Sequence, residues 1–531
     1  MTRRPRWAAA LILCAAISAA LMPGGARAQE VRHATWGITF PTSQSGRAQD
    51  EFLNGLTAYH LCMFEDALEH FRAAQKLAPD FAMAYWGEAL AHHRPIWSVY
   101  ERDEARAALN RLAPTPAGRQ AKAPTARERA YLTAVEVLYA DGPVAERERA
   151  FSEAMGRLSD QYPDDSEALA LYTLTRVLRV VPRSNERERL NTAAMALEVL
   201  RRNPRHPGAP RYLIQTVNDP VHASLGLLGA RAIEAWPEAG GSESVHIPSH
   251  ISMIYGWWEK AEAANRRAFE ISMDWTRRHG VRLDQLNVHN YGHLVDFRQY
   301  ALLQLGRHRD AWGLVDRTGA DFAASGQARP IGSAYFGARA LYIVETGEWT
   351  RAAALADEAR AAGFGGNASV LEAVGFGAAR TGRLDAARSA ADALAGLQGV
   401  QGRTAALEIR GLVALAEGDR DLALRHLKAA VDLAEQGGTP QVPNPAKPAW
   451  ELYGEVLLDL DRPAEALKQF TRALEVYRNR SAAVVGAARA HARLGDRAAA
   501  ERRYREVLAN WRTADADHAG VREARTLLES Q

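Results

Sequence analysis

Four histidines and one aspartate form the group of side chains in this sequence that is best suited to chemistry. His246 and His250 are four residues apart, as are His289 and His293, and Asp296 follows three residues later. Residues four apart lie on one face of a helix, so two such pairs can bring four imidazoles to one point. Imidazoles bind Zn²⁺, Cu²⁺ and Fe²⁺, and a nearby carboxylate can orient a ligand or act as a base. One prediction is therefore a metal-binding site or a metal-dependent enzyme.

The other prediction is a groove that binds a protein or peptide partner without a cofactor. Pro248 lies between His246 and His250, and proline is tolerated only in the first turn of a helix, so the four-residue geometry of this pair is open. Groove side chains also bind the backbone of an extended peptide. We favour this scaffold interpretation over the enzyme. The residues expected to line the concave face are Tyr85, Trp86, Trp97, Arg211, Tyr212, Gln215, His246, His250 and His293.

A second group of metal-ligand side chains lies near the start of the chain. Thiolate, thioether and imidazole together suit copper. A buried cysteine or methionine is more often part of a hydrophobic core, so core packing is the favoured interpretation here. The sequence contains no Gly-x-Ser-x-Gly, no phosphate-binding glycine loop and no His-Glu-x-x-His. The residues of this group are His60, Cys62, Met63, His92, His93 and Trp97.

The elements that must position these side chains are helix-turn-helix repeats. Ala466 and Ala500 are 34 residues apart, and Phe470 and Tyr504 repeat with the same spacing. This period, with small residues where two helices touch, is typical of the tetratricopeptide repeat. The chain is predicted to be all-α, a tetratricopeptide-type superhelix or α-solenoid of roughly ten to twelve helix pairs. No convincing alternating pattern of β-strands is found.

Glycines mark the ends of the first helices of these pairs. Each of several repeat centres has a glycine five residues before it, and only glycine adopts a left-handed conformation cheaply. The first helices line the concave face of such a superhelix, so the histidines of the central repeats are expected to face one groove. The glycines are Gly256, Gly306, Gly347, Gly382 and Gly418.

The chain is expected to fall into six segments. Self-association through the last of them is also possible, because regular repeats are general interaction surfaces. The segments are a signal peptide (1–28), an N-terminal extension (29–50), N-terminal repeats (51–240), central repeats with the histidine-lined face (241–435), a Pro/Gly-rich loop (436–448) and regular C-terminal repeats (449–531).

The N-terminal segment predicts export. Arg3, Arg4 and Arg6 precede a short apolar run, and the Ala-Arg-Ala motif at 26–28 fits a cleavage site. We expect the mature protein to be periplasmic in a bacterium, with no membrane-spanning segment after signal removal. Removing the four arginines of the signal from 66 basic residues leaves 62, against 63 acidic residues. This balance predicts no nucleic-acid partner.

Several short words resemble those of a group of exported bacterial tetratricopeptide repeat proteins of undefined activity. The resemblance covers roughly residues 50–310 and implies a shaped, polar concave pocket. Members of the group carry two histidines where this chain has Arg211 and Gln215, so the resemblance implies one imidazole pair fewer here. Arg211 could instead meet an anionic group. The words are FAMAYWG at 81–87, PIW at 95–97, HPG at 206–208, HIPSH at 246–250 and HN at 289–290.

Overall fold

The computed structural model describes residues 37–97, 99–177, 185–235, 241–286, 289–437 and 446–529. Thr35–Gln531 forms one compact unit. The expected signal peptide and residues 438–445 of the expected Pro/Gly-rich loop lie outside the described residues. None of the described helices combines the length and the apolar composition needed to cross a membrane.

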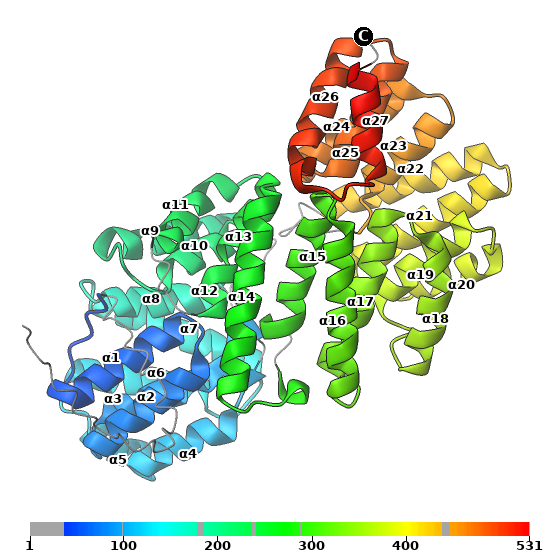
Figure 1. Ribbon diagram of the computed structural model, residues 1–531. Coiled ribbons are helices and arrows are strands. Elements are labelled where there is room, and N and C mark those ends of the chain that lie inside the picture. The colour runs from blue at the N-terminus through cyan, green and yellow to red at the C-terminus, as the bar shows by residue number, and fades with distance from the viewer. Residues whose placement is uncertain are drawn as a thin grey trace, which may run out of the picture. The chain divides into compact units, whose positions relative to one another are not determined.

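Helices make up almost all of the described structure (Figure 1). Those of the first half are α1 (Gly46–His60), α2 (Phe64–Leu77), α3 (Ala82–Ala91), α4 (Arg102–Leu112), α5 (Pro116–Ala121), α6 (Ala126–Leu138), α7 (Val144–Gln161), α8 (Ser166–Thr175), α9 (Glu186–Arg202), α10 (Ala209–Thr216), α11 (Ala223–Glu234), α12 (Ser242–His246), α13 (Pro248–Tyr255) and α14 (Trp258–Arg278). Those of the second half are α15 (Leu294–Gln304), α16 (His308–Ala324), α17 (Arg329–Thr346), α18 (Ala352–Ala361), α19 (Ala368–Arg380), α20 (Leu384–Ala395), α21 (Val400–Ala416), α22 (Arg420–Gln436), α23 (Ala449–Asp459), α24 (Pro463–Val476), α25 (Ser481–Arg493), α26 (Arg497–Asn510) and α27 (Ala519–Glu529). Short helical turns are η1 (Pro95–Trp97), η3 (Leu283–Gln285), η4 (His289–His293), η5 (Trp349–Arg351) and η6 (Trp511–Thr513).

Consecutive helices pack as hairpins, which confirms the predicted all-α repeat architecture. The contacting pairs are α1–α2, α3–α4, α6–α7, α8–α9, α10–α11, α13–α14, α15–α16, α17–α18, α19–α20, α21–α22, α23–α24 and α25–α26. A small departure is an antiparallel pair of strands, β1 (His93–Arg94) and β2 (Val99–Tyr100). Two residues per strand are too few to leave an alternating pattern in the sequence, which is why these strands were not predicted.

The helix contacts use the small and aromatic residues of the repeat as expected. A Cβ atom added to Gly454 would lie 2.9 Å from the Phe470 ring, and one added to Gly486 would lie 2.2 Å from it. Phe470 therefore fills the space between two successive hairpins, and only glycine leaves room for its ring. The same arrangement recurs in the first repeat among Gly55, Phe71 and Gly87.

The glycines predicted to end first helices are all left-handed. Their φ angles are 67° at Gly256, 68° at Gly306, 72° at Gly347, 77° at Gly382 and 87° at Gly418. A residue with a Cβ is strained in this conformation. The sequence pattern therefore placed these five helix-helix turns correctly.

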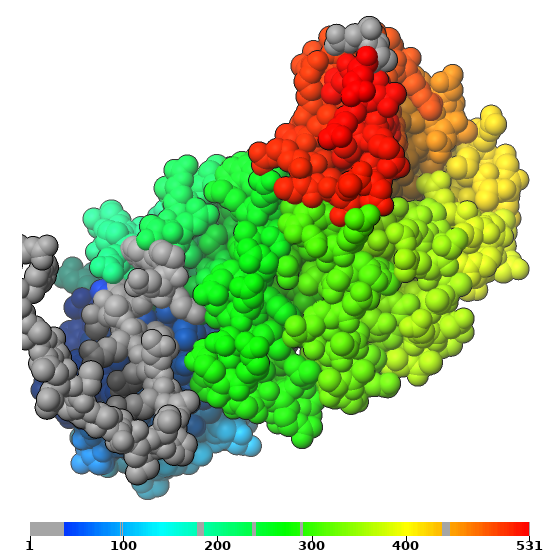
Figure 2. Space-filling view, viewed as in Figure 1, coloured from blue at the N-terminus to red at the C-terminus, as the bar shows by residue number. Residues whose placement is uncertain are grey.

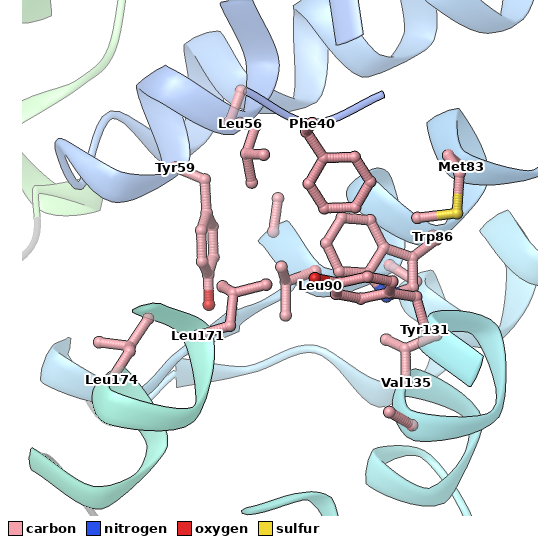
Figure 3. Packing of buried hydrophobic residues seen from close by; sticks show 14 of the residues in the cluster. Phe40, Leu56, Tyr59, Met83, Trp86, Leu90, Tyr131, Val135, Leu171 and Leu174 are labelled. Atoms are coloured by element: carbon pink, nitrogen blue, oxygen red, sulfur yellow. The ribbon is translucent and has the colours of Figure 1, made fainter. Parts of the chain in front are cut away.

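The core of the N-terminal repeats contains residues that were expected in the groove. Figure 3 shows Trp86 packed in one cluster with Phe40 and Tyr131, whose ring centroids lie 5.8 and 5.2 Å from it. Trp86 is fully buried, and Tyr85 is buried with its hydroxyl donating to the carbonyl oxygen of Pro79 at 3.0 Å. Every residue of helix α3 is buried, and all but Glu88 are uncharged, so the helix lies inside the structure instead of lining an open face. This corrects the expectation for both residues.

The C-terminal hairpins contact turns of the central repeats that lie far earlier in the sequence. The Asn479 amide donates to the carbonyl oxygen of Gly256 at 2.8 Å, and the Trp258 indole donates to that of Asn479 at 2.9 Å. The Asp515 amide donates to the carbonyl oxygen of Gly306 at 3.0 Å. In Figure 2 the C-terminal helices, in red, lie against the green segments that contain these turns. The last repeats are therefore held to the central ones by specific hydrogen bonds to backbone carbonyl oxygens.

Candidate functional site

Three of the four histidines expected to act together do converge. His246 ends α12, His250 lies in α13, and His293 ends the η4 turn. One ring nitrogen from each lies within 4.8 Å of the others. The side chain of His289 lies outside the described part of the structure, and Asp296 lies in the first turn of α15. The three imidazoles thus form one cluster, which we call the histidine cluster.

Pro248 does not separate the first two histidines. Helix α12 ends at His246 and α13 begins at Pro248, but Ile247 between them keeps helical dihedral angles of −58° and −33°. Proline in this first position of α13 costs no hydrogen bond. The backbone therefore stays helical, and His246 Nε2 comes within 2.9 Å of His250 Nε2.

The histidine cluster is buried, which corrects the expectation that it faces an open groove. His246 is fully buried, His250 is almost so, and His293 is partly exposed. The Phe297 ring lies against all three, with centroid distances of 5.0, 4.8 and 4.4 Å. Helices α10 and α11 pack onto α13 and cover it. Repeat position predicted which side chains meet, but not that the neighbouring hairpin would cover them.

Asn265 determines the tautomer of one imidazole of the cluster, that of His246. The Asn265 amide nitrogen donates to the carbonyl oxygen of Ala261 at 2.7 Å, so the Asn265 side-chain oxygen is an acceptor. That oxygen lies 2.7 Å from His246 Nδ1, which must carry the proton. The lone pair of His246 then lies on Nε2, toward His250. Metal-binding imidazoles are oriented in this way by an acceptor on their other nitrogen.

The second imidazole has a neighbour with two possible orientations. The Asn218 side-chain amide lies 2.8 Å from His250 Nδ1, and its oxygen is buried without a hydrogen-bond partner among the described residues. With the amide nitrogen toward the ring, His250 keeps its proton on Nε2 and donates it to His246. With the oxygen toward the ring, the proton moves to Nδ1 and two lone pairs face each other at 2.9 Å. Only a cation stabilises that second arrangement.

A second buried cluster is a hydrogen-bonded network. His60 Nε2 and His206 Nε2 lie 2.9 and 3.1 Å from the two oxygens of Glu167. His60 Nδ1 lies 2.5 Å from the Tyr212 hydroxyl, and His206 Nδ1 accepts from the backbone amides of Gly208 and of the residue after it at 3.0 Å. Burial opposes the charge of Glu167, but the two histidines hold its pKa far below the usual range. These contacts join α1, α8 and α10, and His206 Nε2 contacts Glu167 as an ion pair without a hydrogen bond.

The residues considered for copper are dispersed among separate partners. His92 Nδ1 lies 2.7 Å from Glu101, and His93 Nε2 lies 3.0 Å from Glu148. Cys62 is buried, and this burial raises the pKa of its thiol to about 12. Different carboxylates bind the two imidazoles, so the structure supports the core interpretation of this group.

The remaining residues expected in the groove are also largely internal. Tyr212, Arg211 and Trp97 are buried, and Gln215 is partly exposed. The Arg211 guanidinium donates to the Gln215 side-chain oxygen at 3.0 Å and lies over the Tyr212 ring. Helix α10 is packed between α9 and α11, which covers it on two sides. This corrects the groove expectation for α10.

Comparison with known proteins adds no family. No family model and no curated protein matches this sequence. Similar solved structures include the APC/C hetero-tetramer Cut9-Hcn1, with a TM-score of 0.31, 12% identity and coverage of 91% of this chain and 96% of that chain. The human IFIT1 dimer with m7Gppp-AAAA has a TM-score of 0.36 and 12% identity, with 90% and 97% covered. A monomeric IFIT1 mutant with Gppp-AAAA has a TM-score of 0.36 and 11% identity, with 88% and 91% covered. The fold assignment therefore rests on the helix packing described above.

Proposed function

We propose that this chain is a helical-repeat protein that binds a transition-metal ion at the histidine cluster. The observation that carries the proposal is the convergence of His246, His250 and His293, with two Nε2 atoms 2.9 Å apart. A tetrahedral ion with metal–nitrogen bonds of about 2.0–2.1 Å separates its ligands by roughly 3.3 Å, so the His246–His250 pair needs only a small displacement, and the ring nitrogen of His293 lies within 4.8 Å of both. A set of imidazoles suits Zn²⁺, Cu²⁺ or Fe²⁺.

The number of protein ligands decides what such an ion can do. Three imidazoles leave one position for water or a substrate, as in catalytic zinc sites, whereas four close the site. His289 is the fourth histidine named from the sequence. A His289→Ala variant that keeps the ion supports an open site and metal-dependent chemistry. A variant that loses the ion supports a closed, structural site.

Elemental mass spectrometry of untagged protein purified from cells tests the proposal. The His246→Ala/His250→Ala double variant removes two ligands. The matched control is His279→Ala/His426→Ala, which removes one exposed and one partly exposed imidazole outside the cluster. We expect near-stoichiometric zinc, copper or iron in the intact chain and the control, and none in the first variant. A metal-free intact chain, or equal metal in both variants, contradicts the proposal.

A second candidate function is binding of a protein partner by the C-terminal repeats. The observation that favours it is a row of carboxylates on the first helices of successive hairpins, α17, α19, α21 and α23, which pack side by side. These carboxylates belong to Glu345, Glu372, Glu408 and Glu451. The hydrophobic packing of the hairpins does not require these charges. Export of the chain, as predicted from its N-terminal segment, would place such a partner in the bacterial periplasm.

A further inference from the structure

The charged side chains of the C-terminal repeats surround Arg480, which is only 1% exposed. Its guanidinium donates to both oxygens of Glu451 at 2.7 and 3.0 Å. It also donates to Glu345 at 2.7 Å and to the Tyr300 hydroxyl at 2.7 Å. Arg480 thus joins α15, α17 and α23, and its positive charge offsets the negative charges of Glu345 and Glu451.

Two other cations offset the negative charge of Glu455, which lies one helical turn after Glu451 on α23. Lys447 lies 3.1 Å from Glu451 and 2.5 Å from Glu455. Arg380 lies 3.9 Å from the other oxygen of Glu455. Three cations, Arg480, Lys447 and Arg380, therefore serve three carboxylates.

Two further carboxylates have no such partner. Glu372 on α19 and Glu408 on α21 make no hydrogen bond and no ion pair with any described residue. Glu408 is 1% exposed, and its Oε1 atom is buried without a hydrogen-bond partner. Glu372 is partly exposed and lies on the neighbouring first helix. A buried carboxylate without a partner costs several kcal/mol unless it binds a proton or a cation.

We propose that Glu372 and Glu408 bind a cationic side chain, a lysine ammonium or an arginine guanidinium, of a partner polypeptide. This inference rests on the second candidate function and names the chemistry of the partner. A divalent metal ion fits less well, because neither of the ligand clusters found among the described residues contains these glutamates. An ammonium with three donors, or a guanidinium with five, can satisfy carboxylates on two adjacent helices.

The protonation of these carboxyls supports the proposal. Burial, and then the charge of Glu345, raises the pKa of Glu372 to about 7. Burial and the charge of Glu372 raise the pKa of Glu408 well above its usual range. Without a ligand they therefore hold protons near neutral pH, and a bound cation should displace them. The charged groups that face them are Glu345, Lys447, Glu451 and Glu455.

Isothermal titration calorimetry with the intact chain tests the inference, using a tetralysine peptide and spermidine as probes. The Glu372→Gln/Glu408→Gln variant removes both carboxylates. The control Glu465→Gln/Glu475→Gln makes the same change of charge at exposed positions on α24. We expect tetralysine to bind the intact chain and the control, and to bind the first variant at least tenfold more weakly. Titration in buffers of different ionisation enthalpy should show proton release near pH 7 that is absent from the first variant.

Each outcome decides a different point. Unchanged affinity and proton release in the Glu372→Gln/Glu408→Gln variant, or no binding of either probe, overturns the inference. Stronger binding of spermidine than of tetralysine shows that the site takes free polyamines, which overturns the polypeptide assignment. Retained helicity by circular dichroism separates lost binding from lost folding. Metal content is measured independently, so failure here is distinguishable from failure of the metal proposal.

Discussion

Replacing Arg480 by methionine should destabilise the C-terminal repeats by about 3–5 kcal/mol, the cost of removing one partner from a buried ion pair. Methionine approximates the length of the side chain but leaves Glu345 without a cation and Glu451 with Lys447 as its remaining cation. Burial opposes the charge of Arg480, but these carboxylates raise its pKa well above the usual value, so it is charged at any working pH. Most of this loss of stability therefore comes from two buried carboxylates that have lost the Arg480 guanidinium, and a smaller part comes from lost packing contacts.

This reasoning predicts a specific rescue. The double variant Arg480→Met/Glu451→Gln removes the cation together with its bidentate partner and should recover at least half of the lost stability. Arg480→Lys should fall between, because lysine keeps the charge but not the two-pronged geometry. Native-state hydrogen exchange of peptides from α23 and α25 measures the local free energy of opening, which suits a repeat array. A loss below about 1 kcal/mol for Arg480→Met, or no rescue in the double variant, would refute the reasoning.

Three further predictions concern packing, pH and reactivity. Gly486→Ala should destabilise the chain by about 1–2 kcal/mol in urea denaturation, since overpacking against Phe470 outweighs the gain in helix propensity, and adding Phe470→Leu should restore stability. Burial, and then the charge of His308, lowers the pKa of His518 from 6.5 to about 4. The stability that comes from packing the neutral His518 ring against His308 is therefore complete above pH 6.5 and is lost as the pH falls toward 4. An NMR titration of His518 in the folded chain should give that lowered pKa, and an unshifted value contradicts the packing. The buried Cys62 thiol should react with a disulfide reagent at pH 8 only after unfolding.

The repeat architecture could be predicted from sequence because its determinants are local. Gly256 and its equivalents must be left-handed, and Phe470 needs glycine on both neighbouring hairpins, so spacing alone identifies the turns and contacts. The pairing of Asn479 with Gly256 could not be predicted. It depends on the accumulated rotation of many repeats, which no local pattern records.

The candidate site was predicted in part. Repeat position correctly brought His246, His250 and His293 together, because it sets which face of a helix each side chain occupies. It did not predict the neighbours that orient them, Asn218 in the turn after α10 and Asn265 on α14, since a single asparagine in a turn or on a helix carries no distinctive spacing signal. Burial of the cluster likewise depends on how one hairpin covers the next.

Glu167 and Glu408 were not identified from the sequence for the same physical reason. Glutamate is common throughout the sequence, so neither residue stands out, and the environment of each is set by helices distant in sequence. His206, one of the two histidines beside Glu167, gave a partial signal through the HPG word at 206–208. Glu408 gave none, because an unpartnered carboxylate becomes visible only when the surrounding side chains are placed.

Titration of the intact, metal-stripped chain with Co²⁺, followed by visible absorption, tests the central claim most directly. Cobalt in a four-coordinate site with nitrogen ligands absorbs far more strongly than the octahedral aqueous ion, so the spectrum reports the coordination itself. We predict strong bands that saturate at one equivalent, disappear in the His246→Ala/His250→Ala variant and persist in the His279→Ala/His426→Ala control. Weak octahedral bands, or strong bands that survive loss of both His246 and His250, would contradict a metal site at the histidine cluster.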